Sequence, residues 1–279
     1  MRGETGFAHC VPGACHARPS LPAVPAQRGL SQRRALLPAE WICEDERMAY
    51  DASTLPDVSG LTVGIIGGTG DQGRGLAYRF ARAGQTVLIG SRSAERAAQS
   101  AAEIAALPGV PAATSVSGAG NDEVARRSDV VIIAVPWDGH AATVAALAEP
   151  LAAKIVVDCV NPLGFDKQGP YALQVPEGSA VQQAAALLPD SRVCAAFNHV
   201  SAPLLADPEI DRIDLDVLIC TEDRELVGVV AALAARIPGM RGIYAGRLRN
   251  AHQIEAFTAN LIAINKRYKA HAGIRVTDL

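Results

Sequence analysis

The 279-residue chain has little cysteine, few aromatic side chains and no excess of basic charge. Its six cysteines are scattered and form no C-x-x-C pair, which disfavours a disulfide framework and indicates a reducing, cytoplasmic setting. A net charge of −3 disfavours a nucleic-acid partner, since such proteins usually carry a basic excess. No apolar run reaches the ~18 residues that a membrane-spanning helix needs. The remaining classes are globular, with one large or two small domains.

Residues 1–56 show neither helical nor strand periodicity and are interrupted by prolines. These are Pro12, Pro19, Pro22, Pro25 and Pro38. No signal peptide is predicted, because Arg33-Arg34 is soon followed by Pro38 and Glu40 instead of an apolar stretch. The cluster of His9, Cys10, Cys15 and His16 has poor zinc spacing, so no metal is predicted. We expect a disordered tail or a mis-assigned start, with Met48 opening a shorter reading frame.

A glycine-rich motif follows the first predicted strand, residues 61–66, which is a β-branched apolar run. Gly68, Gly70 and Gly73 satisfy G-x-G-x-x-G, and a helical repeat then runs as far as Gly84. In a dinucleotide fold the first glycine permits a tight turn, the second lets a pyrophosphate approach, and the third lets helix pack on strand. The helix N-terminus attracts the phosphates. We therefore predict a dinucleotide-binding (Rossmann) site.

The end of the next strand, residues 86–89, bears on the choice of cofactor. An NAD site usually places Asp or Glu about 20 residues after the glycines, to hold the ribose hydroxyls. Here the chain reads Gly90-Ser91-Arg92, and the first carboxylate is Glu95. This segment lacks the carboxylate typical of an NAD site.

Two arginines favour NADP(H) instead. Ser93 is expected to cap the next helix, which places Arg96 in the first turn, where the helix dipole disfavours a cation. A 2′-phosphate bound between Arg92 and Arg96 resolves that conflict. Ser91 and Thr69 are the expected hydroxyl partners.

Strands and helices alternate along the rest of the chain. Further strands are predicted at 129–135, 154–157, 193–197, 215–219 and 243–244. Helices are predicted at about 138–149, 179–188 and 223–235. The alternation predicts an α/β fold with a doubly wound parallel sheet, in which the last strands form a further β-α-β unit. The segments after Val135, Val157 and Phe197 should then meet at the carboxyl edge of the sheet, over the cofactor.

No acid–base constellation stands out. There is no G-x-S-x-G elbow, no HExxH helix and no P-loop. Asp138 and His140 are explained by an exposed helix start, and His199 is either a packed imidazole or a cofactor contact. A dehydrogenase acting on an alcohol needs a proton acceptor. Hydride transfer between two redox cofactors needs only stacking, distance and exclusion of water.

Several strings together carry a family resemblance. They are Gly67-Gly68-Thr69-Gly70 with Gly73 and Gly75-Leu76-Ala77, Gly90-Ser91-Arg92, Val135-Pro136-Trp137, Ile155-Val156-Val157 and Ala195-Ala196-Phe197-Asn198-His199. With them the chain resembles the NADPH-dependent reductases of coenzyme F420, an 8-hydroxy-5-deazaflavin. The loop Val160–Phe165 is similar to that of the bacterial branch. The resemblance covers residues 57–279.

This resemblance implies a reversible hydride transfer between NADP(H) and F420, by proximity and with no acid or base residue. By position, it implies that Thr69, Gly70, Asp71 and Gln72 hold the pyrophosphate, and that Ser91, Arg92 and Arg96 hold the 2′-phosphate. Val135 and Pro136 would flank the nicotinamide, and Ala202 would lie near both rings. Asn198, His199, Val200 and Ser201 would line the deazaflavin, and Ala272-Gly273-Ile274 would close over it.

The last predicted helix, about 249–271, carries Ile254, Phe257, Leu261 and Ile264 on one face. This face either caps the sheet of its own chain or, as the resemblance implies, contributes to a homodimer. We predict a Rossmann NADP-binding domain at 57–246 and a C-terminal helical cap or dimer segment at 247–279.

Two other functions stay open. One is an NADP-dependent reductase of a small carbonyl or imine substrate, which should present an acid such as lysine in the cleft. The four lysines, Lys154, Lys167, Lys266 and Lys269, are not obviously placed for this. The other is a non-catalytic NADPH-sensing module, for which the Pro-rich tail would be a docking arm.

Overall fold

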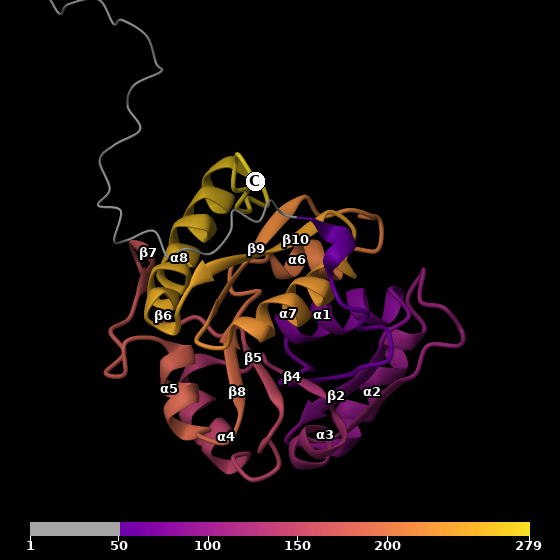
Figure 1. Ribbon diagram of the computed structural model, residues 1–279. Helices are drawn as coiled ribbons and strands as arrows, with labels where there is room; N and C mark the ends of the chain where they lie inside the picture. The colour runs from indigo at the N-terminus through magenta and orange to yellow at the C-terminus, as the bar shows by residue number, and fades with distance from the viewer. Residues whose placement is uncertain (1–50) are drawn as a thin grey trace, which may run out of the picture. The chain divides into compact units, whose positions relative to one another are not determined.

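The computed structural model describes residues 51–279, which form an eight-stranded sheet with helices on both faces (Figure 1). Residues 1–50, most of the predicted tail and including His9, Cys10, Cys15 and His16, lie outside the described residues. Residues 51–56 also belong to the predicted tail. They contain a short 3-10 helix at Ala52–Thr54, and Leu55 packs against the core.

The first half of the described chain alternates strand and helix. Its elements are β1 (Thr62–Ile66), α1 (Asp71–Arg82), β2 (Thr86–Ser91), α2 (Ala94–Ala105), β3 (Val116–Gly120), α3 (Asn121–Arg127), β4 (Val130–Ile133), α4 (His140–Ala146) and β5 (Ile155–Asp158). Gly84 ends α1 in the left-handed conformation, at φ 79°, as expected for a helix stop. The strands of this half that pair are parallel, and β1 is buried between β2 and β4.

The second half adds a hairpin, two outer strands and a long helix. Its elements are β6 (Leu163–Asp166), β7 (Gly169–Ala172), α5 (Ala180–Leu187), β8 (Arg192–Ala195), α6 (Ala202–Ala206), β9 (Leu215–Thr221), α7 (Arg224–Ala235), β10 (Met240–Gly246) and α8 (Ala251–Tyr268). In Figure 1, α8 lies beside the β6–β7 hairpin, and the two elements are in contact.

Six strands follow the order β3-β2-β1-β4-β5-β8, which is that of dinucleotide-binding folds. The order reverses between β1 and β4. In such sheets a ligand binds outside the carboxyl ends of the strands at this reversal. The predicted doubly wound architecture is confirmed in this part of the molecule.

The prediction of a wholly parallel sheet is wrong at one junction. The final β-α-β unit is present, since β9 and β10 are parallel to each other, but β9 pairs antiparallel with β8. A parallel neighbour needs a crossover that carries the chain back across the sheet. Here the connection, residues 196–214, instead stays against α1, where the Arg79 guanidinium donates hydrogen bonds to the carbonyl oxygens of Leu205 and Ile210.

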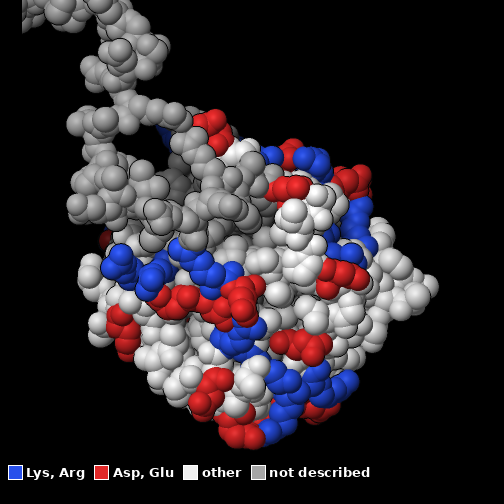
Figure 2. All heavy atoms as spheres, viewed as in Figure 1, with Lys and Arg blue, Asp and Glu red and all other residues white. Residues whose placement is uncertain are grey.

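Two cores lie on opposite faces of the sheet. One joins α1, α2 and α7 to the strands, and the other joins α3, α4, α5 and the start of α8. On the side seen in Figure 2, acidic and basic side chains are interspersed, not gathered by sign, in keeping with the small net charge. No helix within residues 51–279 is long and apolar enough to cross a bilayer.

Candidate functional site

The turn from β1 into α1 is built from glycines in three different roles. The sequence had suggested that Gly68 makes the tight turn. The left-handed conformation falls instead at Gly67, which has φ 81°. A Cβ on Gly68 would lie 2.8 Å from the Ile89 side chain, so Gly68 allows close contact with β2. A Cβ on Gly73 would lie 2.6 Å from the Gly67 carbonyl oxygen, so this glycine lets α1 pack on the turn, as predicted.

The N-terminus of α1 is open at the surface. Gly70 is exposed, makes no side-chain cap, and a Cβ there would meet only the Gly67 oxygen at 3.5 Å. Asp71 in the first turn can offer an anion only its backbone N–H, because its carboxylate repels one. Gln72 donates from Nε2 to the Phe197 carbonyl oxygen at 3.3 Å, which ties the turn to the segment after β8. Thr69 is half-buried in the turn.

A second polar site lies where β2 meets α2. Ser93 caps α2, as predicted, by accepting the Arg96 N–H at Oγ, 3.3 Å away. The hydroxyl of Ser93 donates to the Glu95 carboxylate, and buried Ser91 accepts the Ser93 N–H. Arg92 and Arg96 are exposed, and neither has an ion-pair partner within residues 51–279. Two unpaired guanidinium groups at a helix N-terminus suit a phosphate monoester.

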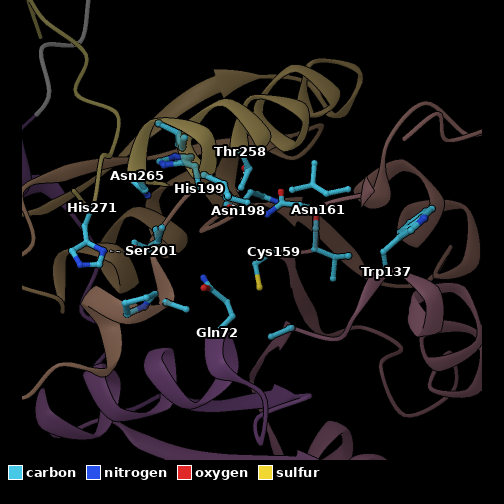
Figure 3. A pocket seen from close by; sticks show the side chains of 18 of the residues that line it. Gln72, Trp137, Cys159, Asn161, Asn198, His199, Ser201, Thr258, Asn265 and His271 are labelled. Carbon is cyan, nitrogen blue, oxygen red and sulfur yellow. Dashed lines mark hydrogen bonds between the residues drawn. The ribbon is translucent and has the colours of Figure 1, made fainter. Parts of the chain in front are cut away.

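A cavity of about 920 Å³ opens at the carboxyl ends of β4, β5 and β8 (Figure 3). Its strand-end walls are residues 134–138, residues 159–161 with Leu163 and Phe165, and residues 198–203. Gln72 and α8, with the segment that follows it, complete the lining. The expected meeting of the segments after Val135, Val157 and Phe197 is therefore confirmed.

Half of the predicted site residues line this cavity. They are Gln72, Val135, Pro136, Asn198, His199, Val200, Ser201 and Ala202. The other half lie at the β1–α1 and β2–α2 turns: Gly68, Thr69, Gly70, Asp71, Gly73, Ser91, Arg92 and Arg96. The structure thus divides the predicted set between the two turns and the cavity, with Gln72 at the boundary.

Sequence reasoning missed one wall of the cavity. Thr258, Leu261, Ile262 and Asn265 of α8 line it, followed by residues 269–271. The signal was present, because Thr258 and Asn265 place polar groups two turns apart on the helix face that carries Leu261. Lys269 is also in the lining, a position not expected for any of the four lysines.

His199 is buried and neutral. The residue is 3% exposed, and its Nε2 accepts the Leu218 N–H at 3.3 Å, which leaves the proton on Nδ1. Burial lowers the pKa of His199 to about 4. The Nδ1 atom has no hydrogen-bond partner within the described residues. Phe197, two residues before His199, has φ 62°, a strained conformation for a bulky residue, and this turn directs the chain into the cavity wall.

Three buried polar atoms in residues that line the cavity have no partner within residues 51–279: Nδ1 of His199 and the Oδ1 atoms of Asn161 and Asn198. Buried polar atoms are nearly always hydrogen-bonded in native proteins. A bound molecule that satisfied all three atoms would need both N–H and C=O groups, which a deazaflavin ring has.

The explanation of His140 as part of an exposed helix start is wrong. His140 is fully buried, and its Nε2 lies 2.6 Å from Oδ2 of the equally buried Asp158. The sequence could not reveal this pair, because the two residues lie on different elements and Asp158 reads as the end of a strand. Trp137 stacks on the imidazole, with ring centres 5.5 Å apart, and lines the cavity.

The segment after α8 is tied across the end of the cavity. The Ala272 N–H donates to Asn265 Oδ1 at 2.6 Å, and His271 Nδ1 lies 3.2 Å from the Ser201 hydroxyl. The Asp216 N–H donates to the Ile274 carbonyl at 2.8 Å. Of the three residues expected to close over the ring, Ala272 lines the cavity, whereas Gly273 and Ile274 do not.

The chain is similar to known reductases over most of the described part. The family model for coenzyme F420-dependent NADP oxidoreductases matches residues 62–162. The F420-dependent NADP reductase of Methanothermobacter thermautotrophicus is 39% identical over 224 residues, which span 78% of this chain and 96% of that protein. The F420-dependent NADP reductase of Methanocaldococcus jannaschii is 38% identical over 225 residues, spanning 78% and 99% of the two chains.

Solved structures agree with this fold. A structure from Arthrobacter sp. FB24, described as that of a candidate F420-dependent NADP reductase, matches with a TM-score of 0.64 and 27% identity. The match covers 78% of this chain and all of that one. A pyrroline carboxylate reductase from Plasmodium falciparum with NADP bound matches at 12% identity, with a TM-score of 0.50 and coverage of 76% and 67%. That likeness extends to the fold alone.

Proposed function

Because the chain belongs to the family of F420-dependent NADP reductases, we propose that it transfers a hydride reversibly between NADP(H) and coenzyme F420. The observation that carries the proposal is the placement of the cavity. It opens beside the glycine turn, so a nucleotide bound at the turn can reach the cavity with its nicotinamide end. Family membership, fold and site then agree on one reaction.

The nucleotide half of the site is assigned to the two turns. We assign the pyrophosphate to the backbone N–H groups from Thr69 to Gln72 and the 2′-phosphate to Ser91, Arg92 and Arg96. The supporting observations are the exposed α1 N-terminus and the guanidinium groups without acidic partners. The first carboxylate after β2, that of Glu95, is held by the Ser93 hydroxyl. This arrangement favours NADP(H) over NAD(H).

The ring half of the site is assigned to the cavity. Val135 and Pro136 are assigned to the nicotinamide, and Asn198 to Ala202 to the deazaflavin. When both groups are bound, the nicotinamide supplies a hydride from C4 to C5 of the deazaflavin, and a proton from solvent completes its reduction. The residues of the chain then need only align the rings and exclude water. His199 suits this role, since it is neutral near pH 7. It can donate a hydrogen bond to a ring but does not act as an acid.

The proposal is tested by mixing the purified protein with NADPH and oxidised F420 and following the visible absorbance of the deazaflavin. NADH and flavin mononucleotide are the controls. We expect rapid bleaching with NADPH and F420 only. If NADPH binds tightly but the deazaflavin is not bleached, the proposal is wrong and a reductase of another substrate, or an NADPH sensor, takes its place.

One observation keeps a small carbonyl or imine reductase as a second candidate. Lys269 lines the cavity at the end of α8 and could supply a proton donor there. The substitution Lys269→Met separates the two functions. It should leave reduction of F420 by NADPH measurable, because that reaction needs no protein acid, whereas turnover of a carbonyl or imine substrate should be lost.

We also propose a homodimer in the cytoplasm. The outward side of α8 exposes Phe257, Ile264 and Tyr268, and the neighbouring hairpin exposes Phe165 and Tyr171. Large exposed apolar side chains on neighbouring elements are typical of a protein interface. A second copy of this chain is the expected partner, since most homo-oligomers pair the same surface on both subunits. The described cysteines are all free and buried, in keeping with a reducing compartment.

A further inference from the structure

A buried ion pair lies behind the cavity wall and has no part in the assignments above. His140 begins α4 and Asp158 ends β5, and both side chains are fully buried. The second ring nitrogen, Nδ1, lies 2.9 Å from Oε1 of Gln183, whose amide nitrogen contacts Glu177 at 3.3 Å. Both ring nitrogens thus face oxygen atoms, the arrangement of a doubly protonated imidazole.

The groups around the pair favour this charged form. Burial lowers the pKa of His140, but the hydrogen bond and charge of Asp158 outweigh it, so the pKa lies above its ordinary value. Glu255 of α8 acts in the same direction. It is buried, accepts the Ala180 N–H at 2.9 Å, and has a pKa raised to about 7 by burial. The other packed elements contribute the Gln183 amide of α5 and the neutral Trp137 ring.

A chain of hydrogen bonds runs from this pair to the cavity. The second oxygen of Asp158, Oδ1, accepts the Val160 N–H at 2.9 Å. The backbone carbonyl oxygen of Val160 accepts a hydrogen bond from Nδ2 of Asn198 at 3.1 Å. The backbone carbonyl oxygen of Asn198 in turn accepts a hydrogen bond from Nδ2 of Asn161 at 2.6 Å. Both amide nitrogens are therefore committed to backbone oxygens. The two Oδ1 atoms are left as acceptors without partners within residues 51–279, in residues that line the cavity (Figure 3).

We propose that His140 and Asp158 are a positioning pair, which holds the 159–161 loop. The loop in turn lets Asn161 and Asn198 present their side-chain Oδ1 atoms to N–H groups of the ring bound in the cavity. The inference rests on the proposed function, which makes that ring a deazaflavin with its imide N–H. A buried acceptor without a donor is costly, so these oxygens favour a ring that carries one. The pair acts through the loop and does not touch the ring.

A fluorescence measurement tests the pair without F420. The chain has two tryptophans, so Trp41→Phe leaves Trp137, stacked on His140, as the only emitter. A protonated imidazole quenches a stacked indole. At pH 7.5, Asp158→Asn should release the His140 proton and brighten Trp137, whereas His252→Gln, a change at a histidine outside the cavity lining, should not. Equal emission from the Asp158→Asn variant and its parent would overturn the charged pair.

Kinetics test the positioning role. Asp158→Asn should raise KM for F420 about tenfold, the value of one buried hydrogen bond, while KM for NADPH and kcat at saturation stay within about twofold. The double variant His140→Gln/Asp158→Asn replaces the ion pair with two amides that can bond to each other and to Val160. It should fold even if the single variant does not, and should bring KM for F420 back towards the wild-type value.

Two results would overturn this role: an unchanged KM for F420 in the folded single variant, or a fall in kcat with KM unchanged. Equilibrium dialysis of F420 without NADPH separates this inference from the proposed function. If the wild-type protein binds F420 but does not reduce it, the proposed function fails. If F420 is reduced and the dialysed affinity of the folded Asp158→Asn variant is unchanged, the positioning role fails.

Discussion

Arg92 and Arg96 are the residues to which we assign the 2′-phosphate, and with it the preference for NADP(H). Both are exposed at the start of α2, and neither has an acidic partner within the described part of the chain. A guanidinium without an acidic partner does not stabilise the fold through an ion pair. Binding of a ligand is therefore the simpler explanation for two such arginines at the start of α2. Lysine would serve less well, because its point charge lacks the planar fork that matches phosphate.

Replacement of Arg92 by alanine should weaken NADPH binding by about 1.5–3 kcal/mol, the range for a charge-assisted hydrogen bond. NADH lacks the 2′-phosphate, so its affinity should change little. Isothermal titration with both nucleotides measures the difference. Arg127→Ala is the control, since that exposed arginine pairs with Glu123 on α3. Equal weakening of both nucleotides in Arg92→Ala would make Arg92 a structural residue.

His199 should make the protein less stable in acid. Its folded-state pKa of about 4 lies below the ordinary value of 6.5, so below pH 6.5 the unfolded chain binds a proton that the folded chain does not. The free energy of unfolding should therefore fall by up to about 3 kcal/mol between pH 7 and pH 4 from this group alone. Urea unfolding of His199→Gln should show a smaller loss over that range. Identical pH profiles for the variant and the wild type would contradict the neutral buried imidazole.

At the scale of elements, the N-termini of α1 and α3 form a natural comparison. Both helices begin after a glycine in extended conformation that makes no side-chain cap, Gly70 for α1 and Gly120 for α3. Both sites have room for a methyl group, since the nearest atom to a Cβ on Gly70 is 3.5 Å away and none lies within 4 Å of one on Gly120. Only Gly70 belongs to the glycine turn assigned to the pyrophosphate.

Gly70→Ala should therefore fold like the wild type yet bind NADPH at least tenfold more weakly, because the new methyl group occupies the approach of the pyrophosphate. Gly120→Ala should fold and bind normally. Thermal unfolding and NADPH titration of the two variants provide the comparison. Full NADPH affinity in a stable Gly70→Ala protein would place the pyrophosphate elsewhere.

At the scale of the whole molecule, α8 serves two surfaces. Ile254 and Leu261 are buried against the rest of the chain, whereas Phe257 is 42% and Tyr268 is 73% exposed. The single apolar stripe expected from the sequence is thus split between a side buried against the core and the cavity, with Ile254 in the core and Leu261 in the cavity lining, and an outward apolar face. This division accommodates both interpretations of the helix, as a cap and as a dimer contact.

The double substitution Phe257→Ser/Tyr268→Ser should shift the protein from dimer to monomer, since it removes two large apolar groups from the proposed interface. Light scattering coupled to size-exclusion chromatography gives the mass directly. Ala263→Ser is the control, an exposed change on α8 that removes no large apolar group. A wild-type protein that runs as a monomer would rule out this interface.

The sequence predicted what depends on local patterns. Apolar runs identified β1, β4 and β5, and the glycines with Ser93 identified the two turns of the nucleotide site. It missed β3, whose residues Val116–Gly120 carry two glycines, a serine and an alanine and so have no apolar signal. It also missed the β6–β7 hairpin, the reversed direction of β9 and the partner of His140, which depend on contacts between distant segments.

The contribution of α8 and the segment after it to the cavity has a consequence for synthesis of the protein. The strands from β1 to β8, with the glycine turn and the arginines of α2, are complete once residue 195 has been made. The cavity is not, because residues 258–272 supply one of its walls. Domains fold in the order in which the ribosome releases them. A nascent chain should thus acquire the surface proposed for the nucleotide phosphates well before it can enclose a second ring, and we expect NADPH, not F420, to stabilise the chain while it is still being made.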